Sequence, residues 1–427
     1  MKDVSEITTC TVDYGSFLSL ADKLGEKVAR SLYYSPMEDE FRRIEKCAIG
    51  RGLEHVERCD EFMDPEVLKE IDLFIFPDIG WGGLQQYLRS IGKPVWGGMG
   101  ASDYELFRTR FLKMLAEVGL PVPPSKVITG MDALVAHLKT VEDRWVKVNR
   151  FRANMETWHH LDYAHSRQML NSLAKEFGGM AENIVFVVQE PIKDVEEVGY
   201  DGYSVDGQYP DKSFFGFEKK NQLYLGAWLH DAQLPKQVRV VNEAIAPLLA
   251  EMGYRNFTAT EIRGKFFTDP TFRMAGQTQE HYLETCTNLP EIIWAGAQGQ
   301  LVQPKFAAKF CAEATLHYTP GTDDWMILDV PEEVHRWVKC YHYCGKDGVY
   351  HFPPRKSDEL GVVLGLGDTV EQAIDQLKEH YEALAEHNAV AANIEEFAPL
   401  IQEIEEAQAK GIKFSDQPLP DPAVAIT

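Results

Sequence analysis

The chain has 427 residues, 44% hydrophobic and 26% charged, a length that predicts two to four globular domains. Its 43 basic and 66 acidic residues give a net charge of −23, which opposes non-specific binding to nucleic acid or to an anionic membrane. No stretch approaches the roughly 20 apolar residues of a membrane-spanning helix, and residues 1–6 lack the apolar core of a secretion signal. We expect a cytoplasmic protein with neither membrane nor nucleic acid as a direct partner.

The first hundred residues predict a small α/β unit. Apolar runs at residues 72–77 and 94–96 are typical of buried parallel strands, and residues 83–90 fit the crossover helix between them. A glycine cluster follows each strand, at the sheet edge where open α/β folds bind ligands. The glycine spacing does not match a dinucleotide fingerprint, so nicotinamide and flavin cofactors are not expected.

A second unit begins after a predicted helix over residues 103–118, which Gly119 terminates. Strands are predicted at 125–129 and 144–148, and Lys147 stands midway along the second apolar run. A lysine among buried residues is costly unless it meets an anion, so we favour a phosphate contact over a surface position for this side chain.

A polar loop over residues 149–157 follows, and then an apolar strand at 183–189. This strand leads to Glu190 and, seven residues later, to Glu197. Backbone groups of such a hinge can bind an adenine edge while a downstream carboxylate holds ribose hydroxyls. An ordinary strand, loop and strand would give the same pattern.

The most informative segment is a predicted hairpin with a turn at Gly264. Successive side chains of a strand point to opposite faces, so Asp269, Thr271 and Arg273 share one face. The turn brings Glu261 beside them. Two carboxylates can hold Mg²⁺ against phosphates while an arginine neutralises charge on a transferring phosphoryl group. The alternative is a solvated hairpin edge with ordinary surface charges.

Seven cysteines, an odd number spread over a long chain, favour reduced thiols over a disulfide framework. Cys340, His342 and Cys344 form the one sequence cluster with ligand-like residues. A structural zinc site needs four ligands, and we interpret these residues as ordinary strand positions. A Cys/His metalloenzyme that uses them remains a third hypothesis.

Together these parts resemble the ATP-grasp carboxylate–amine ligases, and among them the phosphoribosylamine–glycine ligases. The similarity covers roughly residues 70–280, with a weaker match at 359–373. It implies an α/β ATP-grasp fold preceded by a Rossmann-like domain and followed by a C-terminal hybrid β/helical segment. The implied domains are a Rossmann-like unit, the small lobe, the large lobe with the metal site, and the hybrid domain with its helical tail, at residues 1–102, 103–189, 190–330 and 331–427.

The resemblance also assigns roles to residues. It implies ATP as cosubstrate, with Mg²⁺ or Mn²⁺. The implied metal ligands are Glu261, Asp269 and Thr271. Phosphate-contacting or catalytic roles fall on Arg273 and Lys219. The nucleotide-binding residues are Arg108, Lys147, Glu190 and Glu197, joined by Arg150 and Arg152 of the polar loop, whose charge can bind phosphate.

Three departures from the family pattern bear on the function. The loop at 149–157 has no glycine, Thr271 replaces an asparagine, and the glycine-rich substrate segment expected after Lys219 is missing. We expect a ligase that joins a small carboxylic acid, such as an amino acid like glycine, to an amine through an acyl phosphate. Its partners would be small molecules, and a homo-oligomer is compatible with the sequence. The alternative is a non-catalytic nucleotide-binding or scaffolding protein on an ATP-grasp frame.

Overall fold

A computed structural model describes residues 2–36, 49–150, 157–193, 195–276 and 279–421. Most of its strands form one 14-stranded sheet, and two smaller sheets accompany it. Within the described ranges, every helix is too short or too polar to cross a lipid bilayer.

The first part of the large sheet is parallel, in the order β5-β4-β1-β2-β3. Its apolar strands are buried, and helices connect several of them, as the sequence predicts for the α/β unit. The strands are β1 (Thr8–Val12), β2 (Arg30–Tyr34), β3 (Glu57–Arg58), β4 (Leu73–Phe76) and β5 (Val95–Gly97). The helices are α1 (Leu18–Gly25), α2 (Pro65–Glu70) and α3 (Gly82–Ser90).

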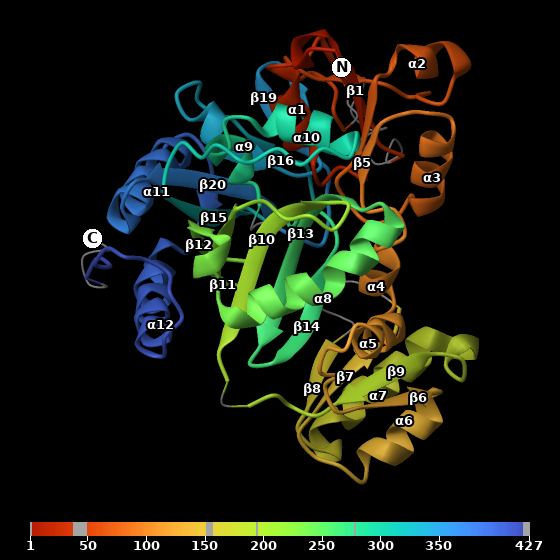
Figure 1. Cartoon of the computed structure of the whole chain (residues 1–427). Helices are drawn as coiled ribbons and strands as arrows, with labels where there is room; N and C mark the ends of the chain where they lie inside the picture. The colour runs from red at the N-terminus through yellow and green to blue at the C-terminus, as the bar shows by residue number, and fades with distance from the viewer. Residues whose placement is uncertain (1, 37–48, 151–156, 194, 277–278, 422–427) are drawn as a thin grey trace.

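The second part of the same sheet is antiparallel and extends from β17 to β13, with β14 paired to β13. One antiparallel pairing, Arg255 with Gly97, joins the two parts. The strands are β10 (Glu197–Val205), β11 (Lys212–Lys219), β12 (Leu223–His230), β13 (Arg255–Arg263), β14 (Phe266–Thr271), β15 (Phe310–Tyr318), β17 (Val338–Cys340), β20 (Glu359–Gly367) and β21 (Val390–Ala391). Helix α8 (Lys236–Met252) lies across β10 and β13 in Figure 1, and α10 (Leu289–Ala297) packs near β5.

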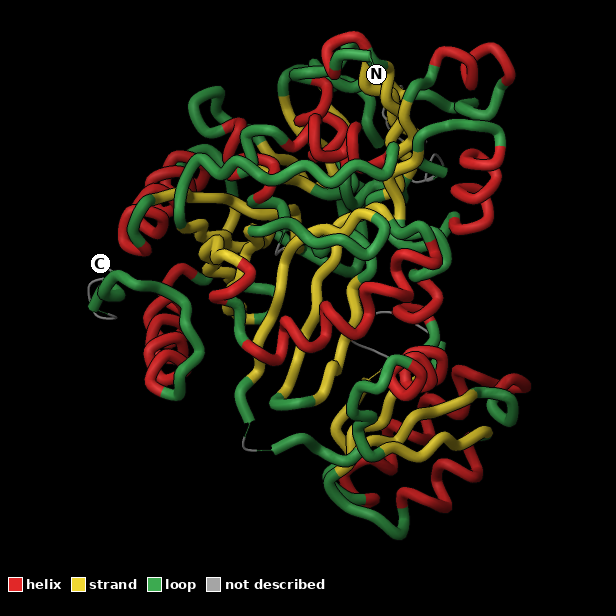
Figure 2. The backbone as a smooth tube through the Cα atoms, viewed as in Figure 1, coloured by secondary structure: helices red, strands yellow, loops and turns green. Residues whose placement is uncertain are grey.

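A separate four-stranded sheet, in the order β6-β9-β7-β8, forms a small lobe at the bottom of Figure 2. Sheet side chains such as Val146 pack against helix side chains such as Leu134 in one hydrophobic cluster. The strands are β6 (Ser125–Thr129), β7 (Arg144–Val148), β8 (Thr157–His160) and β9 (Val185–Gln189), with helices α6 (Met131–Leu138) and α7 (Tyr163–Phe177).

The C-terminal part completes the fold. A three-stranded sheet contains β16 (Met326–Leu328), β18 (Cys344–Lys346) and β19 (Val349–Phe352). Helix α11 (Val370–Ala385) packs on β20, and its N-cap Thr369 accepts a hydrogen bond from the Gln372 amide. Helix α12 (Phe397–Ala409) contacts β11.

One predicted helix is interrupted. The segment expected as a single helix over residues 103–118 forms α4 (Ser102–Leu106) and α5 (Arg108–Glu117), and Phe107 between them is extended at φ −126°, ψ 100°. Helix α4 contacts β14 of the large sheet, whereas the Arg108 amide donates to Asn149 O at 3.0 Å, at the end of small-lobe strand β7. The break therefore lies where the chain passes from the large sheet to the small lobe.

Candidate active site

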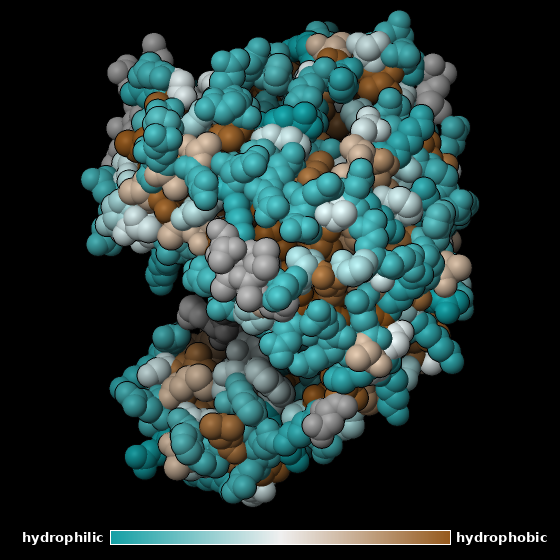
Figure 3. All heavy atoms as spheres, turned by 90° about the vertical axis from the view of Figure 1, so that its left-hand side faces the viewer, coloured by the Kyte–Doolittle hydropathy of each residue, from teal (hydrophilic) through white to brown (hydrophobic). Residues whose placement is uncertain are grey.

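A cavity of about 600 Å³ is walled mainly by strands β10, β11, β13 and β14. In Figure 3 the molecular surface is hollowed between the small lobe, at the bottom, and the rest of the molecule. The cavity wall is strongly acidic. Eight carboxyl side chains line it, those of Glu196, Glu197, Asp201, Glu218, Glu261, Asp269, Glu403 and Glu406. Three basic side chains also line it, those of Lys220, Arg263 and Arg273.

The predicted hairpin forms one side of this cavity. Strands β13 and β14 pair with Glu261 opposite Asp269, and Gly264 takes the left-handed turn conformation at φ 59°. Burial and the neighbouring Asp269 carboxylate raise the pKa of Glu261 to about 8, against the opposing effect of Lys220. A divalent cation between these carboxylates would remove their mutual repulsion. The hard oxygen donors fit Mg²⁺ or Mn²⁺.

Thr271 and Arg273 lie on the same wall, as the alternation predicts. Arg273 Nε donates to Glu105 Oε1 at 2.9 Å and lies 3.6 Å from Asp78 Oδ1. Burial lowers the pKa of Arg273, but the charges of Glu105 and Asp78 outweigh burial and raise it overall. Burial raises the pKa of Glu105 to about 7, although Arg273 opposes the shift. The arginine is thus fixed in place by a carboxyl group from α4.

Lys147 and Arg108 lie together in a small hollow of about 20 Å³ beside Gln189. Burial, and then the charge of Arg108, lower the pKa of Lys147 to about 8, while Asp269 and Glu261 raise it. The electrostatic coupling to both hairpin acids places the ammonium near the acidic wall. Two cations beside each other in a partly buried hollow repel each other, and an anion such as phosphate would relieve this repulsion.

The other predicted nucleotide residues are more dispersed. Glu197 lines the cavity and accepts a salt bridge from Arg263 Nε at 2.6 Å. Glu190 is exposed and lies 3.7 Å from Arg144. Arg150 is exposed and sits over the Phe107 ring at 5.4 Å. Arg152 and most of its loop lie outside the described residues.

Lys219 differs from its neighbour. It forms an ion pair with Glu403 of α12 and is not among the residues that line the cavity. Lys220, one position later, lines the cavity, and Glu261 raises its pKa. Sequence reasoning therefore missed Lys220, which lies one residue past the end of β11, in the adjoining turn.

Two further groups near this wall were not expected from the sequence. Glu105 comes from a helix expected to be continuous, so nothing linked it to Arg273. Asp201 accepts a hydrogen bond from the Tyr224 hydroxyl at 2.9 Å, and both residues line the cavity. Acidic residues are rarely buried in strands, so an acid within a predicted strand, such as Asp201, could have been singled out as a candidate site residue.

The cysteine hypotheses need correction. Cys344 is disulfide-bonded, although free thiols occur at Cys10, Cys59, Cys286, Cys311 and Cys340. Among the described residues, Cys340, His342 and Cys344 do not form a metal-ligand group. Burial lowers the pKa of His342 to about 4, as expected for a neutral core histidine.

The chain has the ATP-grasp fold of ATP-dependent ligases, at low sequence identity to the solved structures that share this fold. No protein-family model matches the sequence, and no curated protein does. Solved structures do match. Phosphoribosylamine–glycine ligase from Thermotoga maritima has a TM-score of 0.64 at 13% identity, over 91% of this chain and 98% of that chain.

Two other similar structures span comparable lengths. The biotin carboxylase domain of Hydrogenobacter thermophilus 2-oxoglutarate carboxylase, with bound MgADP and bicarbonate, has a TM-score of 0.64 at 12% identity, over 96% of each chain. The L-amino acid ligase from Bacillus licheniformis has a TM-score of 0.57 at 13% identity, over 91% of this chain and 99% of that chain. These structures share the fold but not one substrate.

Proposed function

We propose that this protein is an ATP-dependent ligase that joins a small carboxylic acid to an amine. The observation that carries the proposal is the pairing of Glu261 with Asp269 on one wall of the cavity, with Arg273 beside them and Lys147 electrostatically coupled to both acids. The similar structures reported above are ligases and a carboxylase domain, the last described with bound MgADP, and they support this class of chemistry.

The charge of the cavity supports a cation requirement. Eight carboxyl groups against three basic groups would repel a nucleotide triphosphate that arrived alone. Divalent cations held by Glu261, Asp269 and Thr271 would reverse the local charge. When bound, Mg²⁺ would neutralise phosphate oxygens and the charge that develops during phosphoryl transfer.

The proposed reaction has two steps. A substrate carboxylate oxygen attacks the γ-phosphorus of ATP, the bond to the β-phosphate oxygen breaks, and ADP leaves. The amine nitrogen then attacks the acyl carbon of the acyl phosphate, inorganic phosphate leaves, and the amine loses a proton. Arg273, fixed by Glu105, would neutralise the transferring group, and Lys147 with Arg108 would hold the phosphate chain.

The substrates belong to this proposal. An amino acid such as glycine is our first candidate for the acid, and the partners would be small molecules. The tyrosine and carboxylate side chains of Tyr224, Asp201 and Glu218 lie on the cavity wall, where a substrate ammonium group would find hydrogen-bond acceptors.

The test is ADP formation by purified protein with Mg-ATP against a panel of amino acids and amines, including glycine with phosphoribosylamine. Turnover should require one acid and one amine, and it should fall roughly 100-fold or more in Glu261→Gln with Asp269→Asn. The matched control is Asp375→Asn with Glu379→Gln, which removes two charges from the exposed face of α11. Near wild-type turnover in the hairpin double variant would refute the assignment.

The scaffold alternative predicts a different outcome. The glycine-free loop and Thr271, where the family pattern has an asparagine, favour it. Nucleotide binding that depends on Glu261 and Asp269, without turnover on any acid–amine pair of the panel, would support a non-catalytic role.

A further inference from the structure

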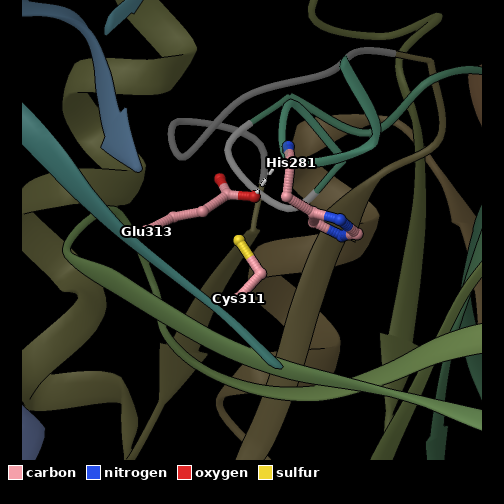
Figure 4. A group of neighbouring side chains, drawn as sticks. All are labelled: His281, Cys311 and Glu313. Atoms are coloured by element: carbon pink, nitrogen blue, oxygen red, sulfur yellow. Dashed lines mark hydrogen bonds between the residues drawn. The ribbon is translucent and has the colours of Figure 1, made fainter. Parts of the chain in front are cut away.

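Three potential metal ligands of different chemical types meet in the core behind the cavity. The donor atoms of His281, Cys311 and Glu313 all lie within 4.8 Å of one another, and all three residues are buried. Cys311 and Glu313 are two positions apart on β15, so they project from one face of that strand. His281 comes from the segment just before α9 (Tyr282–Thr285). Figure 4 shows the Cys311 thiol directed toward the Glu313 carboxyl group, which meets the backbone amide of His281, while the imidazole ring lies to one side.

This donor set selects a particular class of cation. Thiolate and imidazole ligands suit zinc and related transition metals, whereas Mg²⁺ prefers oxygen ligands alone. Metal–ligand distances of roughly 2.0–2.3 Å place the donors around one zinc ion about 3.3–3.8 Å apart. The 4.8 Å limit in the structure is within reach of this geometry by small side-chain rotations.

A second observation comes from Glu313 itself. Its Oε1 accepts a hydrogen bond from the His281 amide at 3.1 Å, but its Oε2 is buried with no hydrogen-bond partner among the described residues. The residue is only 1% exposed. A buried carboxyl oxygen without a partner is costly, and a bound cation is one of the few groups that would satisfy it.

A cluster of neutral, protonated acids and a thiol would give the same arrangement without a metal ion, and the metal content of the purified protein distinguishes the two.

The cluster also adjoins the proposed active site. The His281 ring stacks on Tyr224, with ring centroids 5.5 Å apart and an interplanar angle of 5°. Tyr224 lines the cavity and donates to Asp201. A ligand that holds the His281 ring in place would therefore also restrict Tyr224, which forms part of the cavity wall.

We propose that His281, Cys311 and Glu313 supply three ligands, and a water molecule the fourth, to one zinc-class divalent cation that ties the segment before α9 to strand β15 beneath the cavity. This site is separate from the hairpin acids, and it does not depend on the ligase assignment. Because its ligands are buried, the ion would be acquired during folding.

The test is elemental analysis of the full-length protein expressed in minimal medium with Zn²⁺, and spectroscopy after expression with Co²⁺. The wild type should contain about one metal ion per chain, and the Co²⁺ form should show the near-ultraviolet thiolate-to-cobalt absorption of a cysteine ligand. Cys311→Ser should abolish that absorption, and Glu313→Gln should reduce the metal content several-fold.

Two controls isolate the site. Cys286→Ser removes another buried free thiol outside the cluster and should leave metal content and spectrum unchanged. Glu261→Gln with Asp269→Asn should also leave the thiolate absorption unchanged, because the hairpin has no sulfur ligand. Wild-type protein without stoichiometric metal, or an unchanged cobalt spectrum in folded Cys311→Ser, would overturn the proposal. A far-ultraviolet circular dichroism spectrum would establish that each variant is folded.

Discussion

Replacing Lys147 by methionine should make the nucleotide-free protein more stable at neutral pH while weakening nucleotide binding. The lysine is half-buried on β7, and burial together with Arg108 lowers its pKa from 10.5 to about 8. Its ammonium is therefore disfavoured in the folded chain relative to the unfolded chain. Methionine has a similar length and carries no charge to desolvate.

The magnitude follows from the pKa difference. Each pKa unit corresponds to about 1.4 kcal/mol, so the charged lysine costs about 2–3 kcal/mol once the solvent that still reaches the side chain is considered. Below about pH 8 the lysine is charged in both states and the full cost applies. As the pH rises from about 8 to 10.5, the folded state releases its proton first, and the cost disappears. The stability advantage of Lys147→Met should therefore be largest at pH 7 and should shrink toward pH 10.

Urea unfolding monitored by tryptophan fluorescence measures this difference, because Trp145 and Trp158 lie on the small-lobe strands β7 and β8. Lys126→Met is the matched control: this lysine is exposed on β6, and its loss should change stability by less than about 0.5 kcal/mol. Added Mg-ADP should stabilise the wild type more than Lys147→Met. The reasoning is refuted if Lys147→Met is no more stable than the wild type at pH 7, or if its advantage grows with pH.

Three further predictions concern the cavity wall. Between about pH 4.5 and 7, Glu105 keeps its proton in the folded state but has lost it in the unfolded state. The free energy of unfolding should therefore fall as the pH rises through this window. In urea unfolding, Glu105→Gln should show a weaker dependence of stability on pH than the wild type. Lys220→Met should lower ADP formation roughly 100-fold, whereas Lys219→Met should change it less than about threefold, since only Lys220 lines the cavity; equal losses would contradict this distinction. Gly216→Ala should lower the free energy of unfolding in urea by about 1–3 kcal/mol, because the added Cβ would lie 2.3 Å from the ring of Tyr224. An unchanged stability would show that this ring can move away freely.

Much of the fold could be predicted from local patterns. The apolar runs at β4 and β5 contain the β-branched and aromatic residues that are typical of buried strands. The structure confirms that these two strands pair in parallel. The hairpin was predictable because residues 264–265 form a turn and the alternation beyond it fixes which side chains share a face. These local rules alone would place Glu261 opposite Thr268; an irregularity of the β-bulge kind between Glu261 and Ile262 shifts the register by one residue and brings Glu261 opposite Asp269.

The features that the sequence did not predict depend on contacts between distant segments of the chain. The break at Phe107 has no sequence mark such as proline or glycine, and it arises where α4 packs on β14 and α5 begins beside the small lobe. Glu105 meets Arg273 only because of this break, across 168 residues of sequence. The cluster of His281, Cys311 and Glu313 likewise joins segments about thirty residues apart whose approach no periodicity encodes.

The distribution of charge favours an order of assembly at the active site. The cavity wall is acidic, and Arg273 is already engaged by a carboxyl group. Lys147 and Arg108 lie in the adjoining hollow on the small-lobe side. A nucleotide that enters with its metal ions can satisfy both sides, because the ions meet Glu261 and Asp269 while the phosphates meet Lys147 and Arg108. The nucleotide would then draw the small lobe and the large sheet together, and the acid substrate would bind to a wall whose repulsion the metal ions have removed.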